Sequence, residues 1–237
     1  VDAAKGWAGL SARGDAMMVT LAGAMSTAEL GRSLAAMIRA DKIQAITCTG
    51  ANLEEDLFNL VAHHHYVRLP NYRDLTPKDE ADLAAKQLNR VTDTCIPEEQ
   101  AMRVVEGALL ELWQAAEREG RAAFPHEYFY DLLVNERVAF SPAVNPEHSW
   151  LLAAAEKNLP IFTPGWEDST LGNMFVARHL AGDLRGLDAV RGGLEAMATL
   201  IAWYRQTTED GRGVGFFQIG GGIAGDFPIC VVPLLHQ

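Results

Sequence analysis

Apolar runs alternate with amphipathic segments over the first third of the chain. Two mostly apolar runs, residues 16–22 and 43–48, have the pattern of strands that are buried on both faces. Each run precedes apolar residues at helical spacing, over about residues 30–38 after the first and 53–61 after the second. The segment Ser26 to Glu29 fits a capping box that would begin the first helix. This strand–helix–strand–helix order predicts a parallel sheet with crossover helices.

A polar excursion then interrupts this α/β pattern over about residues 67–145. Its first part, residues 67–98, is polar, contains three prolines and predicts a long irregular segment with one short helix. Apolar spacing predicts a helix over residues 98–119 and another over residues 125–135, and residues 140–145 have the composition of a loop.

The α/β pattern returns in the last third of the chain. It predicts, in order, a helix at 146–157, a strand at 159–163, helices at 169–181 and 186–207, and a strand at 214–219. We find no internal repeat. We therefore expect one Rossmann-like, doubly wound α/β domain over residues 1–237, with a mostly parallel sheet and an inserted helical excursion.

The net charge of the 237-residue chain is −11, which repels phosphate backbones and argues against a nucleic-acid partner. An acidic surface attracts a cationic small molecule, although solubility alone also accounts for it. No apolar stretch is long enough for a membrane span. The start of the chain has no signal-peptide pattern, and it lacks an initiator Met, so we expect it to be trimmed.

The three cysteines are widely separated and lack the Cys-x-x-Cys spacing of a zinc or redox motif. They therefore indicate a reducing compartment, and a cytoplasmic location, rather than a disulfide framework. Cys48 and Cys230 lie in apolar runs, where we expect buried, inert thiols.

Three strand-to-helix turns are the candidate sites for chemistry, because open α/β sheets bind ligands beyond the carboxyl ends of their strands. They lie at residues 49–56, 165–173 and 219–226. In the first, Thr49 to Asn52 is expected to form a turn, and three acids follow in what should be the first turn of a helix. Those acids either complement the helix dipole or face a ligand.

The other two turns also allow two interpretations each. Asp168 suits either a helix N-cap or a ribose hydroxyl. Gly220–Gly222 suits either a pyrophosphate or a tight turn, while the G-x-G-x-x-G fingerprint is absent from the first βα turn. Three consecutive histidines, residues 63–65, point in different directions on a helix, so we predict no metal site there.

These turns, in this order, resemble motifs of the deoxyhypusine synthase family. Residues 49–56, TGANLEED, resemble its T-A-G-G-V-E-E-D motif, and residues 164–174 resemble its P-A-x-T-D-G-S-L-G-D-M motif. Residues 149–162 resemble its S-x-x-x-A-x-K-N-x-I-P-V-F stretch, and Gly220–Gly222 its L-G-G-G turn. The blocks LAGAMSTAELG, NYRDLTP and GFFQIGGGIAGDFPICVVPLLHQ are most similar to the bacterial deoxyhypusine synthase-like branch.

The resemblance implies a Rossmann-like fold, a homotetramer with active sites between subunits, and NAD as the cofactor. It further implies transfer of an aminobutyl group from spermidine, through an enzyme lysine, to an acceptor amine. That acceptor is a protein lysine in deoxyhypusine (hypusine) formation, or free putrescine in the related homospermidine synthases. A catalytically inactive homologue that binds NAD or a polyamine is a further alternative.

Carried over by position, the resemblance assigns two sets of site residues. The residues expected to touch NAD are Thr49, Gly50, Ala51, Glu55, Asp168 and Gly221. The residues expected to face the polyamine are Glu54, Glu55, Asn173 and Asp226. Paired carboxylates suit this task, because burying an unpaired ammonium group is costly.

The chain departs from the family at several of these positions. Asn173 stands in the place of an Asp, and Asp226 in the place of a His, so one acid is lost and one is gained. Residues 25–31 replace the family's S-N-L-I-S-S-G loop at the nicotinamide. A different polyamine or acceptor is therefore plausible.

The catalytic residue that the resemblance implies has no counterpart in this chain. The family's lysine lies in a W-G-K context well downstream of the triple glycine, beyond Gln237, so we expect a C-terminal truncation. Lys157 belongs to the K-N-x-I-P motif and does not substitute for that lysine.

Overall fold

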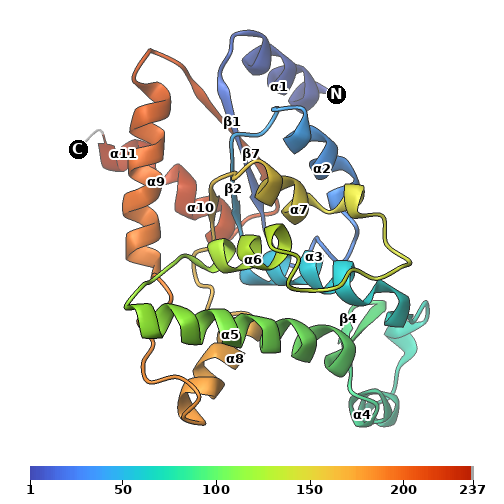
Figure 1. Cartoon of the computed structure of the whole chain (residues 1–237). Coiled ribbons are helices and arrows are strands. Elements are labelled where there is room, and N and C mark those ends of the chain that lie inside the picture. The colour runs from blue at the N-terminus through green and yellow to red at the C-terminus, as the bar shows by residue number, and fades with distance from the viewer. Residues whose placement is uncertain (236–237) are drawn as a thin grey trace.

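A four-stranded parallel sheet forms the centre of the computed structural model, which describes residues 1–235 (Figure 1). The strands lie in the order β6-β2-β1-β7. Their bounds are β1 (Ala16–Leu21), β2 (Ala45–Cys48), β6 (Ile161–Phe162) and β7 (Val214–Ile219). The chain thus builds outward from β1 in one direction through β2 and β6, and then returns to place β7 on the other side of β1. This order confirms the predicted Rossmann-like α/β class, and its switch point lies between β1 and β7.

The sheet is buried on both faces, as its apolar runs predicted. Every residue of β1 and β2 is buried. Neighbouring residues of β1 belong to different clusters: Val19 packs into the large hydrophobic core, whereas Met18 packs into a smaller cluster with Leu200 and Val231. Successive strand side chains point to opposite faces, so these two clusters are the two sides of the sheet.

Helices cover the two faces of this sheet (Figure 1). On the face of the large core lie α2 (Gly31–Arg39), α3 (Gly50–Ala62), α7 (Trp150–Glu156) and α8 (Thr170–Leu180). On the face of the smaller cluster lie α9 (Gly193–Thr208), α10 (Ile223–Ile229) and α11 (Val231–Leu235). Helix α1 (Asp2–Ala12) precedes β1 and has no buried residue. None of the helices between residues 1 and 235 has the length and apolarity that a bilayer crossing requires.

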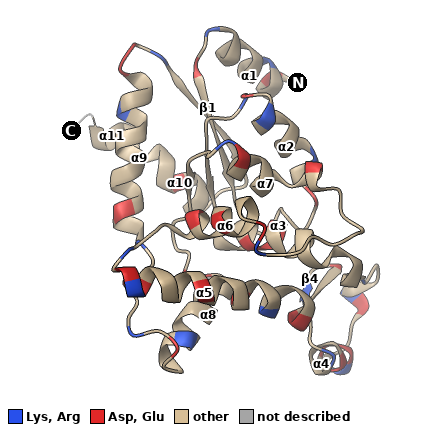
Figure 2. Ribbon diagram, in the orientation of Figure 1, with Lys and Arg blue, Asp and Glu red and all other residues tan. Residues whose placement is uncertain are grey.

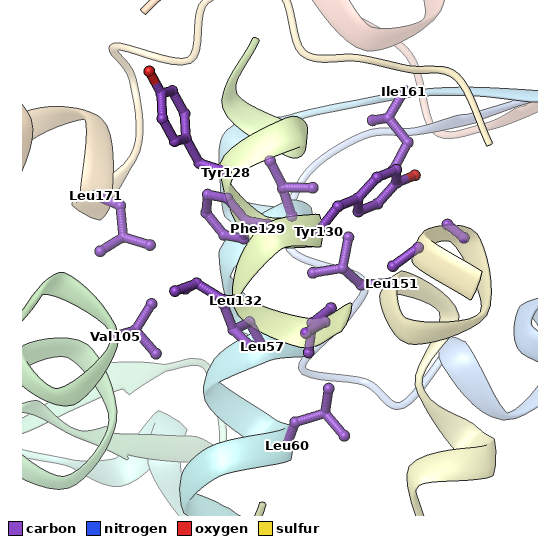
Figure 3. Packing of buried hydrophobic residues seen from close by; sticks show 14 of the residues in the cluster. Leu57, Leu60, Val105, Tyr128, Phe129, Tyr130, Leu132, Leu151, Ile161 and Leu171 are labelled. Carbon is purple, nitrogen blue, oxygen red and sulfur yellow. The ribbon is translucent and has the colours of Figure 1, made fainter. Parts of the chain in front are cut away.

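The excursion supplies two long helices to the large core. A π-helical turn (Glu98–Arg103) leads into α5 (Val104–Glu119), and α6 (Pro125–Val134) follows, so both predicted helices are confirmed. In Figure 3, α6 lies at the centre, with Val105 of α5 on one side and Leu151 of α7 on the other. The same cluster includes Leu57 and Leu60 of α3.

The first part of the excursion contains a small antiparallel sheet that the sequence did not predict. Its strands are β3 (Val67–Arg68), β4 (Leu88–Val91) and β5 (Thr94–Pro97), in the order β3-β5-β4, with the predicted short helix as α4 (Pro77–Ala85). β3 is exposed and β4 is only half-buried at its ends, so these strands lack the apolar pattern that marks a buried strand.

Several local predictions were wrong. Residues 23–30 form turns, and α2 begins at Gly31 without a side-chain cap, because Ser26 is hydrogen-bonded to Asn52 instead. Helix α3 already begins at Gly50, so the predicted turn at 49–52 is the cap and first turn of that helix. Helix α9 begins at Gly193 rather than at residue 186.

Cys230 is exposed, which corrects the predicted buried thiol, whereas Cys48 is buried as expected. The apolar neighbours Phe227 and Val231 belong to the smaller cluster and are spaced four residues apart. Cys230 lies between α10, which ends at Ile229, and α11, which begins at Val231, and it is not part of that cluster. The last two residues of the final family-like block, His236 and Gln237, lie outside the described residues.

Gly31 sets the close approach of α2 to α7. A Cβ at this position would lie 2.4 Å from the carbonyl oxygen of His148 and 3.1 Å from a carboxylate oxygen of Asp56. We predict that Gly31→Ala lowers the free energy of unfolding by about 1–3 kcal/mol, because backbone has to move to admit the methyl group. Chemical denaturation measures this loss.

The matched control is Gly107→Ala, at an exposed position in the first turn of α5, where a Cβ meets no atom within 4 Å. It should raise the free energy of unfolding by about 0.5–1 kcal/mol, since alanine favours the helix. Equal effects of the two substitutions would contradict the packing described for Gly31.

Candidate functional site at the carboxyl ends of the strands

The turns that follow the four parallel strands converge at one edge of the sheet. The Thr49 hydroxyl donates to the carbonyl oxygen of Gly23, after β1, at 2.6 Å. A Cβ on Gly50 would lie 2.5 Å from the Cβ of Ser169, in the turn after β6. A Cβ on Gly220, after β7, would lie 2.7 Å from the Cβ of Ala22. The three predicted turns therefore lie together, and the loop after β1 joins them.

Small residues are required where these turns meet. Gly50 has no room for a side chain between Ser169 and Trp166, and a Cβ on Gly172 would lie 2.3 Å from the carbonyl oxygen of Trp166. Gly220 and Gly222 both have positive φ, 84° and 64°, which glycine adopts without a steric penalty. The glycines of these motifs thus first serve the packing of the turns.

The acids of α3 lie in its second turn rather than its first. Thr49 is the N-cap and accepts a hydrogen bond from the backbone N–H of Asn52 at 3.2 Å. The first turn of the helix contains no acid. Glu54, Glu55 and Asp56 therefore do not complement the dipole of their own helix. Figure 2 shows acidic residues on α3, deep among the surrounding elements.

Glu54 caps a different helix. Its two carboxylate oxygens accept hydrogen bonds from the backbone N–H groups of Thr170 at 2.9 Å and Leu171 at 2.8 Å, at the start of α8. The side chain is only 3% exposed, and burial raises the pKa of Glu54 from 4.5 to about 7. Both oxygens thus already have partners, and the carboxylate holds α8, with the turn that carries Asp168, against α3.

Glu55 and Asp56 bind two further segments. One oxygen of Glu55 accepts hydrogen bonds from the hydroxyl and the N–H of Thr27, in the loop after β1. Asp56 accepts from the Ser149 hydroxyl and, at 3.1 Å, from the N–H of Leu151 at the start of α7. Burial raises the pKa of both carboxyl groups, that of Asp56 to about 6.

Asn52 ties the loop after β1 to α3. Its amide nitrogen donates to the carbonyl oxygens of Leu21, Ala22 and Gly23 at 2.8–3.1 Å. Its amide oxygen accepts from the N–H of Ser26 at 3.0 Å. The side chain is fully buried. Asn52 therefore fixes the path of the chain where it leaves the central strand.

The remaining predicted residues lie at or near the surface of this edge. Asp168, Asn173, Gly221 and Asp226 are exposed, and Ala51 is half-buried. The amide nitrogen of Asn173 donates to the carbonyl oxygens of Glu167 and Ser169, so this side chain folds back on its own turn. Asp226 lies in the first turn of α10.

The edge fits a dinucleotide on its geometry. A Cβ on Gly221 or Gly222 would meet no atom within 4 Å, so the turn after β7 is open to a ligand. This open turn lies at the switch point between β1 and β7, where doubly wound sheets bind nucleotides. Asp168 is exposed close by, on the turn after β6, and is free of ion pairs among residues 1–235.

The three histidines form a short 3₁₀ turn at the end of α3, in which the rings of His64 and His65 lie 3.9 Å apart between centroids. A ring nitrogen of His63 lies 2.7 Å from the Asn59 amide oxygen, and one of His64 lies 2.7 Å from the Ser141 hydroxyl.

Lys157 forms a surface ion pair with Asp41 at 2.7 Å, away from the converging turns.

The sequence analysis missed the residues that donate hydrogen bonds to Asn52, Glu55 and Asp56. Ser26, Thr27 and Ser149 are ordinary polar residues in the sequence, and nothing in their spacing links them to α3. Asn52 could have been noticed in the sequence, because it stands where the T-A-G-G motif has its second glycine and so adds a side chain there.

Comparison with known proteins agrees with this fold and these motifs. A solved structure of a protein from Entamoeba histolytica, assigned as a deoxyhypusine synthase, has a TM-score of 0.55 at 15% identity and covers 88% of this chain and 58% of its own. This likeness supports the Rossmann-like fold. The sequence profile of the family described as deoxyhypusine synthase matches residues 2–235, and the chain belongs to that family.

The bacterial branch is confirmed by two relatives named deoxyhypusine synthase-like protein. The one from Cyanothece sp. is 30% identical over 225 residues, which are 92% of this chain and 53% of the relative. The one from Thermosynechococcus vestitus is 28% identical over 222 residues, with the same coverage of 92% and 53%. The chain thus spans about half the length of these curated relatives.

The raised pKa of Glu54 predicts a pH-dependent stability. The folded state holds the Glu54 proton more tightly than the unfolded state does, so its contribution is fully present below pH 4.5 and is lost as the pH rises to about 7. We expect the stability of the wild type, relative to Glu54→Gln, to fall by up to about 3 kcal/mol over this window. Thermal and urea unfolding at about pH 5 and about pH 8 measure the difference.

The comparison with Glu54→Gln is necessary because His126 also changes the stability of the protein over this pH range. Burial lowers the pKa of His126 to about 4, which makes stability rise with pH over part of the same window. Glu111→Gln, at an exposed position of α5, is the control and should track the wild type at every pH. A wild-type-minus-E54Q difference that stays constant with pH would show that Glu54 is ionised in the fold throughout.

Proposed function

We propose that this chain is the core of an NAD-dependent enzyme that transfers an aminobutyl group from spermidine, or a related polyamine, to an amine acceptor. The observation that carries the proposal is the meeting of the four strand-end turns at one edge of the sheet, with an open glycine turn at the switch point and buried carboxylates on α3. Family membership supports the reaction class. The acceptor is a protein lysine or a free diamine such as putrescine.

NAD, when bound, supplies the acceptor for a hydride removed from the carbon beside a polyamine nitrogen. Of the chain's own residues, Asp168 would hold ribose hydroxyls, and the backbone at Gly221 would approach the pyrophosphate. Thr49, Gly50 and Ala51 would form the wall between them, with the Thr49 hydroxyl fixing the neighbouring turn at Gly23.

The carboxylates of Glu54 and Glu55 would have different tasks. Glu54 already accepts two backbone N–H groups, so its task is to position the Asp168 turn rather than to bind the amine directly. Glu55 uses one oxygen for Thr27, and its second oxygen accepts no hydrogen bond from residues 1–235. Glu55 would therefore neutralise one ammonium group of the polyamine, with Asp226 and Asn173 offering polar contacts at the exposed edge.

This division of tasks fits the physics of amine binding. A buried ammonium group needs a carboxylate partner to offset its lost hydration. The catalytic benefit of such a site is to hold the C–H donor and the cofactor in one geometry, because the hydride chemistry belongs to NAD. We assign no nucleophile among residues 1–237. A homotetramer and a cytoplasmic location remain part of this proposal.

We predict that Gly221→Val weakens NAD binding at least tenfold without changing the melting temperature. A Cβ at this position would meet no protein atom within 4 Å, so the substituted side chain would project into the space proposed for the cofactor. Calorimetric titration with NAD measures the affinity. The control is Gly192→Val, also at an open position but at the start of α9, and it should bind NAD like the wild type.

The reaction itself is tested on the protein encoded by the complete gene. Adding NAD and spermidine should produce the near-ultraviolet absorbance of bound, reduced nicotinamide. Homospermidine formed with putrescine as the sole acceptor would identify the free-diamine alternative. NAD binding without reduction in the presence of common polyamines would favour the inactive binding homologue, and absence of NAD binding would refute the proposal.

A further inference from the structure

Strand β7 forms one edge of the parallel sheet, and its outer side has no partner strand among residues 1–235. Every residue of β1 is buried, whereas β7, which pairs with β1 along its whole length, has only Gly215 buried. The outer side of β7 is therefore open to solvent. Such an open edge offers its backbone N–H and C=O groups to another strand.

The hydrogen bonds to β1 show which backbone groups of β7 face outward. The N–H of Ala22, just after β1, donates to the carbonyl oxygen of Ile219 at 3.0 Å, so the backbone groups of Ile219 face β1. Successive residues of a strand turn their backbone groups alternately to its two sides. The residues whose backbone groups face outward, without a strand partner in the described chain, are Val214, Phe216 and Gln218.

The composition of this edge favours a second copy of the chain as its partner. Residues 213–225, which include β7 and the glycine turn, contain no charged side chain, although the net charge of the chain is −11. β7 also lacks proline. Edge strands that avoid other strands usually carry charges, prolines or bulges. Two copies of β7 can therefore meet without like-charge repulsion at the contact.

The outward groups determine the register of such a pair. A two-fold axis, the commonest symmetry of protein assemblies, pairs two identical edge strands in antiparallel order. The register that uses all the outward groups places Phe216 opposite its counterpart and Val214 opposite Gln218 of the second copy. Continued past the ends of β7, the same register places Arg212 of one copy opposite Gly220 of the other.

The candidate site has no positive charge of its own. The four strand-end turns, residues 22–30, 49–56, 163–173 and 220–226, contain acids but no Lys, Arg or His. A pyrophosphate is negatively charged, so apart from backbone N–H groups at the glycine turn this edge would repel it. A cation from outside these turns would remove the conflict.

Arg212 is suited to supply this charge, but only to another copy. Its side chain is exposed and forms no ion pair with residues 1–235. Asp15, which lines the same small cavity, is already paired with Arg13 at 2.8 Å. Arg212 precedes β7 and the glycine turn follows it, so the six residues of the strand separate them by roughly 20 Å. Arg212 therefore cannot reach the turn of its own chain.

We propose that two copies of the chain pair their β7 strands in antiparallel order, and that Arg212 of each copy binds the pyrophosphate of NAD at the glycine turn of the other. A guanidinium group matches phosphate oxygens with two parallel hydrogen bonds, which suits it to this task. The inference rests on the proposed function for the ligand being NAD. It adds a residue from a second copy that completes the site.

Gln218→Pro tests the contact between the two strands. Proline removes a backbone N–H that faces away from β1, so the parallel sheet keeps all its bonds while the added strand loses one. The sedimenting mass should fall to about half that of the wild type. Gln218→Ala is the control, because it loses the same side-chain bond to Gly225 but keeps the N–H, and its mass should not change. A monomeric wild type, or an unchanged mass of a folded Gln218→Pro, would overturn the proposal.

Arg212→Ala tests the shared site without altering β7. Its melting temperature should equal that of the wild type, because the side chain is exposed, and its affinity for NAD should fall about tenfold or more in calorimetric titration. Arg205→Ala, which removes another exposed arginine without an ion pair among residues 1–235, should bind NAD like the wild type.

Co-expression of Arg212→Ala with Gly221→Val shows whether the arginine acts between copies. In the mixed dimers, the Arg212→Ala chain has an intact glycine turn and receives Arg212 from its partner, so tight NAD binding should return. An arginine that acts within its own chain would give no recovery, and that result would overturn the proposal.

The same titrations keep this inference apart from the proposed function. Tight NAD binding that does not depend on Arg212 would overturn only the inference. Absence of NAD binding by the wild type would refute the proposed function together with the role of Arg212, and sedimentation of Gln218→Pro would then decide the β7 contact by itself.

Discussion

The candidate site depends on helix α3, which is buried but carries a short run of polar side chains. Asn52, Glu54, Glu55 and Asp56 lie close together on α3, and they bind backbone or hydroxyl groups of three other segments. Around the helix, these bonds reach the loop after β1 and the starts of α7 and α8. Burying a carboxylate is costly, and hydrogen bonds to its oxygens offset part of that cost. The geometry of the strand-end turns therefore depends on hydrogen bonds from the side chains of α3, and not on the turns alone.

The sequence predicted the parallel sheet and the long helices, because both depend on apolar periodicity. The runs at β1 and β2 and the spacing on α5 and α6 are strong local signals. The antiparallel strands β3 to β5 escaped prediction because they are short and largely exposed, so pairing rather than burial defines them. The boundary of α2 was wrong because Ser26, which fits a local cap, is used in a contact with Asn52, 26 residues away.

The sequence predicted which turns form the candidate site. It did not predict the hydrogen bonds that hold these turns together. Thr49, Gly50, Asp168 and Gly221 were identified by motif, and their turns do lie together. The roles of the acids could not be foreseen, because partners such as Thr170 lie 116 residues from Glu54.

The position of β7 has a consequence for how the chain acquires this structure. β1 is a central strand, yet one of its two neighbours lies near the opposite end of the chain: Gly213 bonds to Asp15 across 198 residues. On the ribosome, β1 therefore has an unsatisfied side until almost all of the described chain has been made. Pairings of such long range are slow to form, and an unpaired edge invites association with other chains. Recombinant yield should accordingly respond more to chaperone supply and growth temperature than a protein built from local contacts would.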